Sequence, residues 1–169
     1  MFEYTTDAIV LDKEESGDYD AVVHLYTKDL GKIRTKAKSM RKITSRLSAH
    51  LEPGLVATVR IIGRDPMASN RPSFQLVDGL AQKKLFADYG FLGLVKAMTT
   101  DLQEDARLWE FLLAGNPDKK QLFQILGFGG VLRCGMCGAR DANCVYGTDS
   151  LFLCGFCSSN IANNLLTYI

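Results

Sequence analysis

Five cysteines cluster in the last third of the chain, and four of them form two closely spaced pairs. Two residues separate Cys134 from Cys137 and Cys154 from Cys157, and 16 residues lie between the pairs. This spacing is typical of a two-knuckle zinc ribbon. Small residues fill both knuckles (CGMCG and CGFCS) and allow tight turns that aim two thiolates at one metal. The sequence therefore predicts one structural zinc ion, because four thiolates leave no open coordination position.

Two alternatives to zinc remain open at this point. Iron suits the same four-thiolate geometry, and a redox dithiol would also use a closely spaced pair. Cys144, the fifth cysteine, is expected to be a small buried residue, with replacement of one of the four ligands as an alternative. Residues 1–7 carry two acids and no positive charge, so a secretory signal is not expected and a reducing compartment favours metal ligands over disulfides.

The positive charge of the chain is concentrated in one segment. Residues 28–46 hold eight of the 20 Lys and Arg residues and one of the 19 acids, a net charge of +7 in a chain whose remainder carries −6. Basic residues alternate with non-basic ones from Lys32 to Ser39, so a strand would place four cations on one face, about 7 Å apart. Further cations and hydroxyl groups follow Ser39 and suit phosphate oxygens. The predicted DNA contacts are Lys32, Arg34, Lys36, Lys38, Arg41, Lys42 and Arg46.

Other interpretations of this basic segment are weaker. A solvated strand face with lysines that prevent edge pairing is the simplest of them. An acidic protein partner would use the same charges, which leads to the alternative function of a non-enzymatic interaction adaptor. Anionic lipid is disfavoured because no stretch forms a basic amphipathic helix. Bases could stack on one or two aromatic residues; the candidates are Phe2, Tyr4, Tyr19, Tyr26 and Phe74.

The elements that must position these residues indicate an α+β protein. Residues 1–80 contain five short β-rich runs with turn signals between them, which predicts a small closed or nearly closed barrel, with the oligonucleotide-binding (OB) barrel as one candidate. A polar loop is expected from Asp12 to Asp20, and another around Pro66, Asn70 and Pro72.

Helical spacing begins after the barrel. Residues 81–130 are predicted to be a helical region, residues 131–158 a four-cysteine finger and residues 159–169 an amphipathic tail helix. Gly127, Gly129 and Gly130 indicate a hinge into the finger, and Gly147 to Ser150 a turn between its two short β segments. The helices are expected over residues 83–102, 104–114 and 118–126.

The sequence shows no catalytic constellation. It has no Gly-Lys-Ser/Thr phosphate loop, and its two histidines, His24 and His50, stand without a nucleophile at a catalytic spacing. A divalent-ion loop from Asp12 to Asp20 is a weak alternative to a solvated acidic loop. No apolar run reaches the length of a transmembrane helix, so we expect neither an enzyme nor a membrane protein.

In their order along the chain, these features resemble the bacterial recombination mediator RecO family. The similarity is strongest from Thr6 to Pro53 and includes a Gly-acid-x-Asp loop, a Leu-Gly turn, a basic strand and a Ser/Arg/Lys loop before a proline. The residues in those places are Gly17, Asp18, Asp20, Thr27, Leu30, Gly31, Lys38, Arg41, Lys42, Ser45, Arg46, Leu47 and Pro53. Many family members also carry a two-knuckle zinc finger after the helices.

The resemblance implies a fold and a set of partners. It implies an OB barrel joined to a helical domain with the zinc finger, and a cytoplasmic, nucleoid-associated protein that binds single- and double-stranded DNA and anneals complementary strands in repair. It also implies a RecR-like partner and the tail of single-strand-binding protein. The helical region between Leu80 and Cys134 is shorter than in most members, which leaves the interaction with that tail open.

Overall fold

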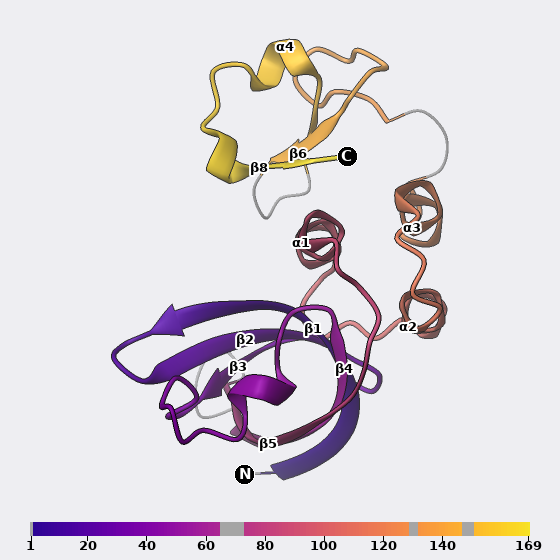
Figure 1. Ribbon diagram of the computed structural model, residues 1–169. Coiled ribbons are helices and arrows are strands. Elements are labelled where there is room, and N and C mark those ends of the chain that lie inside the picture. The colour runs from indigo at the N-terminus through magenta and orange to yellow at the C-terminus, as the bar shows by residue number, and fades with distance from the viewer. Residues whose placement is uncertain (1, 65–72, 129–131, 147–150) are drawn as a thin grey trace.

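The computed structural model describes residues 2–64, 73–128, 132–146 and 151–169. A barrel occupies one end of the molecule, three helices pack beside it, and a small finger lies at the far end (Figure 1). The loop predicted around Asn70, the hinge glycines Gly129 and Gly130, and the turn at residues 147–150 lie outside the described residues. The barrel strands are β1 (Phe2–Ser16), β2 (Asp20–Thr27), β3 (Gly31–Ala37), β4 (Leu55–Arg64) and β5 (Ser73–Lys84).

The five strands close on themselves in the order β1-β2-β3-β5-β4. All neighbouring pairs are antiparallel except β3 with β5, which are parallel and pair only from Thr35 to Ala37. The 3-10 helix η1 (Ser48–His50) lies in the connection from β3 to β4. The five strands expected from the sequence are therefore present, but β5 continues past residue 80 because it pairs with β4 as far as Lys84.

The first strand separates two apolar cores. Residues Ala8 to Leu11 are all buried, although a strand with one solvated face would alternate. Ala8 and Val10 point into the barrel, and Ile9 and Leu11 belong to the core beneath the helices. The expected loop from Asp12 to Asp20 is instead mostly strand, because β1 continues to Ser16 opposite β2 and leaves a turn only at residues 17–19.

Three short helices cover the outer face of β1. They are α1 (Tyr89–Met98), α2 (Ala106–Leu113) and α3 (Lys119–Ile125). Each begins after an aspartate, Asp88, Asp105 or Asp118, whose carboxylate accepts backbone N–H groups of the first turn. The sequence predicts that the first helix begins at residue 83, but α1 begins six residues later. Lys83 and Lys84 belong to β5, and Asp88 caps the helix.

The finger contains a second, small sheet. Its strands β6 (Cys144–Tyr146), β7 (Leu151–Leu153) and β8 (Leu166–Tyr168) lie in the order β7-β6-β8, with helices α4 (Gly155–Ser158) and η3 (Asn163–Leu165) between β7 and β8. The predicted tail helix over residues 159–169 is therefore wrong. Strand β8 pairs with β6, and Leu166 is buried against the cysteine core.

The finger and the helices share side chains. Phe152 of β7 lies with its ring centroid 5.7 Å from Phe123 and 5.1 Å from Phe128. Val145 and Phe152 belong to the same buried cluster as α1 and α2. The finger is thus seated on the helical layer and lies on the opposite side of it from the barrel (Figure 1). Within the described ranges, no helix has the length and apolarity needed to cross a membrane.

Candidate nucleic-acid interface and metal centre

Strand β3 presents its basic residues outward, as the alternating sequence predicts. Ile33, Thr35 and Ala37 are buried in the barrel, while Arg34 and Lys36 are exposed on the outer face. Lys38 is exposed directly after the strand. Because β3 meets β5 along only three residue pairs, the rest of its outer face borders an open groove of about 600 Å³. The groove residues that carry polar or aromatic groups are Ser16, Lys32, Arg34, Thr35, Lys36, Ser73, Phe74 and Asp101.

Lys32 lies on the same face but is used within the protein. Its ammonium group donates to the carbonyl oxygens of Lys96 (2.9 Å) and Thr99 and lies 3.2 Å from the Asp101 carboxylate. Only 15% of its side chain is exposed. The charge therefore neutralises the C-terminal end of α1, where carbonyl groups lack helical partners. Lys32 therefore differs from the other predicted DNA contacts, because its charge is used inside the fold.

Two further cations of the set form ion pairs at the surface. Lys36 lies 3.2 Å from Asp20, and Arg41 lies 2.9 Å from Glu15. The Ser39 backbone N–H and the Lys36 ammonium hold the pKa of Asp20 below its usual value. Exposed pairs of this kind contribute little to stability, so a phosphate can replace the carboxylate at little cost.

The remaining predicted DNA contacts form no ion pair with a carboxylate among the described residues. Arg34, Lys38 and Arg46 are exposed, and no ion pair or side-chain hydrogen bond to them is found there. Lys42 is exposed too, and its ammonium lies 5.5 Å from the centroid of the Tyr19 ring. Arg34, Lys42 and Arg46 therefore offer positive charge to a ligand, as does Lys38, whose charge also helps to lower the pKa of Asp20.

A polar cluster that the sequence did not reveal joins α1 to the barrel. Lys96 donates to Asp12 (2.7 Å) and Glu14 (2.8 Å), and Glu14 also lies 2.9 Å from His24. Hydrogen bonding to Lys96 holds the pKa of Glu14 below its usual value, and the pKa of Asp12 is lowered too, against the raising effect of its burial. The two Lys96 contacts connect residues more than 80 positions apart, and no local spacing in the sequence predicts them.

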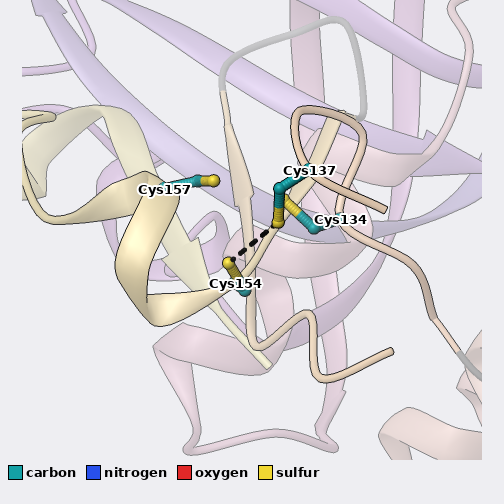
Figure 2. A group of neighbouring side chains, drawn as sticks. All are labelled: Cys134, Cys137, Cys154 and Cys157. Carbon is teal, nitrogen blue, oxygen red and sulfur yellow. Dashed lines mark hydrogen bonds between the residues drawn. The ribbon is translucent and has the colours of Figure 1, made fainter. Parts of the chain in front are cut away.

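The two cysteine pairs meet in the finger. The sulfur atoms of Cys134, Cys137, Cys154 and Cys157 all lie within 4.8 Å of one another, and Figure 2 shows the four side chains converging on one point. The sulfur atoms of Cys137 and Cys154 are 3.7 Å apart. A tetrahedral zinc ion with Zn–S bonds of about 2.3 Å requires sulfur–sulfur distances of about 3.8 Å, so the cluster fits a metal ion of this kind. Among the described residues this is the one group of potential ligands found.

Local backbone geometry explains how the knuckles form. The Cys134 N–H donates to Ala139 O and the Gly138 N–H donates to Cys134 O, both at 2.8 Å, which closes the first knuckle into a loop. Gly135 cannot be replaced without movement, because a Cβ there would lie 2.3 Å from Leu151 Cδ1. The second knuckle enters helix α4, where Ser158 N–H donates to Cys154 O.

Neighbouring backbone groups and thiols shift the pKa values of Cys134, Cys137 and Cys157. Backbone N–H groups of Cys137 and Cys154 lower the pKa of Cys134 to about 6, whereas the Cys137 thiol chiefly raises the pKa of Cys157 to about 12. Four thiolates this close repel one another, and a bound cation relieves that repulsion. Cys144 lies outside the cluster: it is fully buried and its thiol donates to Leu153 O at 3.4 Å, as expected of a small core residue.

Comparison with known proteins identifies the N-terminal region. Residues 1–69 match the family model described as "Recombination protein O N terminal". The chain is 48% identical over 50 residues to the DNA repair protein RecO of Dehalococcoides mccartyi (strain ATCC BAA-2100 / JCM 16839 / KCTC 5957 / BAV1), covering 30% of this chain and 20% of that protein. It is 40% identical over 62 residues to the DNA repair protein RecO of Thermodesulfovibrio yellowstonii, covering 37% of this chain and 25% of that protein.

A third relative gives the same result. The DNA repair protein RecO of Bifidobacterium animalis subsp. lactis is 42% identical over 53 residues, covering 31% of this chain and 22% of that protein. The resemblance to RecO is therefore confirmed for the N-terminal region. In these comparisons the chain spans about a fifth to a quarter of the length of the curated relatives it matches.

Proposed function

We propose that this chain, whose N-terminal region is that of RecO, binds DNA in repair and recombination through the basic face of its barrel. One observation supports the proposal most directly: Arg34, Lys38, Lys42 and Arg46 are all exposed, and none of them forms an ion pair or a side-chain hydrogen bond with a carboxylate among the described residues. Lys36 and Arg41 add two cations whose surface ion pairs can be exchanged for phosphate.

The strand topology supports an OB-type barrel. Five strands in the order β1-β2-β3-β5-β4, closed by the parallel pairing of β3 with β5, match a five-stranded barrel used to bind oligonucleotides. The groove beside β3 opens where that pairing ends, so the basic side chains border a groove of nucleotide size. We infer that single-stranded DNA runs along this groove.

Strand annealing follows from the same chemistry without a catalytic group. A cationic surface reduces the repulsion between two phosphate chains, and base pairing supplies the free energy. The proposal is therefore of a binding protein and not of an enzyme, active on single- and double-stranded DNA. By the resemblance to RecO we include a RecR-like partner and, for the helical region, the tail of single-strand-binding protein.

Zinc is the metal we propose for the cysteine cluster. Cys134, Cys137, Cys154 and Cys157 would hold it, and a closed four-thiolate site leaves no position for a substrate or a reactive water. The ion would fix the finger on the helical layer and take no part in chemistry.

Fluorescence anisotropy with a labelled single-stranded oligonucleotide over a salt series tests DNA binding. Contacts with about four to six phosphates predict a log–log slope near −3 to −4, at about −0.7 per phosphate. The variant Arg34→Gln/Lys38→Gln should bind more weakly and reduce the magnitude of the slope by about 1 to 1.5.

The matched control is Lys83→Gln/Lys84→Gln, which removes two exposed cations at the far end of β5. This control should bind as the wild-type protein does. Equal losses in both double variants would mean that binding follows net charge and not the face of β3.

An adaptor that docks an acidic protein partner is the second candidate. Three predicted contacts, Lys32, Lys36 and Arg41, are already paired with carboxylates, which shows that acidic side chains fit this surface. Capture of a partner protein that resists nuclease and requires Arg34 and Lys38, with no DNA binding at low salt, would favour the adaptor.

A further inference from the structure

Ile43 is displayed to solvent in the middle of the basic loop that follows β3. Its relative exposure is 106%, the highest of the large apolar side chains in the described part of the chain. A single exposed apolar residue is ordinary on a protein surface. Ile43 differs because exposed cations, Arg41, Lys42 and Arg46, lie on both sides of it in the sequence.

The loop around Ile43 is built to hold one shape. Met40 is buried in the barrel core and Leu47 packs against the same core, so both ends of the exposed segment are anchored. Ser39 adopts a positive φ of 54°, and its backbone N–H donates to Asp20 at 2.9 Å. The Lys42 N–H donates to Ser39 O and the Ser45 N–H donates to Lys42 O, which forms consecutive turns.

A second contact joins this loop to the turn between β1 and β2. The Arg41 backbone N–H donates to Tyr19 O at 2.9 Å, and the Arg41 guanidinium donates to Gly17 O and Asp18 O. Tyr19 is 57% exposed, and its ring lies under the ammonium of Lys42. The turn and the loop thus form one tip on the side of the barrel away from the helices and the finger (Figure 1).

This tip carries two kinds of group. Lys38, Lys42 and Arg46 are positioned to hold phosphates, whereas the Tyr19 ring and the Ile43 side chain are apolar and open to solvent. Aromatic rings stack on nucleic-acid bases, and branched apolar side chains insert between base steps in proteins that unstack them. Their location among cations favours a nucleic acid over an apolar protein surface.

We propose that Tyr19 and Ile43 contact bases of bound DNA, with the Tyr19 ring stacked on one base and Ile43 inserted beside it. The inference rests on the proposed function and adds to it a site for unpaired or unstacked bases. Such a site would hold bases apart from their neighbours on the same strand and so expose them for pairing with a complementary strand.

The test uses the full chain with its metal and the salt series described above. Ile43→Ser and Tyr19→Leu should each weaken binding of single-stranded DNA by about fivefold or more, in line with base–aromatic stacking. The slope of log affinity against log salt should stay unchanged, because neither substitution removes a charge. An oligonucleotide containing 2-aminopurine should change its fluorescence on binding the wild-type protein, and much less on binding Tyr19→Leu.

Two matched controls separate this site from general apolar surface. Leu80→Ser removes another exposed aliphatic side chain, 64% exposed on β5, and Tyr89→Leu removes a ring that is 62% exposed at the start of α1. Both controls should bind as the wild-type protein does. Losses in the controls equal to those of Ile43→Ser and Tyr19→Leu would overturn the inference.

The remaining outcomes distinguish this inference from the proposed function. If Ile43→Ser and Tyr19→Leu bind normally while Arg34→Gln/Lys38→Gln is impaired, the base contacts are wrong and the DNA-binding surface stands. If the wild-type protein binds no DNA at low salt, the proposed function fails and the base contacts fail with it.

Discussion

The barrel and the finger differ in the interactions that stabilise them. The barrel surrounds a core of its own, built from aliphatic side chains such as Val23, Leu25 and Ile61, and its five strands close into a ring. The finger has three strands of three residues each, and two of the five residues in its buried cluster are the metal-ligand candidates Cys134 and Cys154. Burial of apolar surface is therefore sufficient for the barrel, whereas we expect the finger to depend on the ion proposed for its cysteine cluster.

Metal removal should have the largest effect, and it should be confined to one region. Treatment with a strong chelator, or Cys154→Ser, should unfold residues 132–169 and leave the barrel folded, because a structural zinc site contributes about 10–16 kcal/mol of binding free energy to folding. Hydrogen exchange measures this directly, residue by residue. Equal loss of amide protection in β1–β5 and in β6–β8 would contradict the independence of the two regions.

Substitution of Gly31 should show that the stability of the barrel depends on the segment between α1 and α2. Its φ is +65°, and a Cβ there would lie 2.0 Å from the Gln103 carbonyl oxygen. Gly31→Ala should therefore lower the free energy of unfolding by at least about 2 kcal/mol, since strain and a backbone clash combine. Urea denaturation followed by circular dichroism measures the change.

Gly17→Ala is the control for Gly31→Ala. Gly17 has a φ of +66° but has open space around it, so only the backbone strain applies and the loss should be about 1–2 kcal/mol. If both variants lose the same stability, the close approach of Gly31 to Gln103 has no energetic importance.

Acid should weaken the contact between the barrel and α1. This effect should be smaller than those of metal removal and of Gly31→Ala. The folded-state pKa values of Asp12 and Glu14 are lowered, so their stabilisation is present above their ordinary values near 4 and is lost as the pH falls through the folded values. The pKa of His24 is also lowered, chiefly by burial, so stability begins to fall below about 6.5 as the unfolded state takes up that proton first.

Lys96→Met isolates this acid effect. It should reduce the free energy of unfolding at pH 7 by about 1 kcal/mol, since the pairs are partly exposed, and should flatten the decline towards pH 4. Urea denaturation at several pH values gives both quantities. An unchanged pH dependence would exclude Asp12 and Glu14 as its source.

Local patterns in the sequence predicted the elements whose causes are local. The alternation from Lys32 to Ala37 predicted which side chains of β3 face outward, and the two Cys-x2-Cys pairs predicted a cluster that the structure shows to fit one ion. In both cases the relevant residues are neighbours or lie on matching turns, so their types and spacing carry the information.

Long-range contacts determined what the sequence did not predict. The Lys32 ammonium donates to carbonyl groups more than 60 residues away, and no pattern in the sequence predicts these contacts. The last residues have helical spacing, yet Leu166 becomes part of a strand because β6 offers an unpaired edge and the cysteine core a place for the side chain. Tertiary pairing outweighs a weak local preference in short segments.

Burial of β1 on both faces has a consequence for work with the isolated barrel. A fragment that stops at Lys84 keeps all five strands but loses the helices that cover Ile9, Leu11 and Tyr26. Those side chains would form an exposed apolar patch, and patches of this kind promote self-association. The fragment should therefore be poorly soluble even though its own core is complete, and replacing Ile9 and Leu11 with polar residues should restore its solubility.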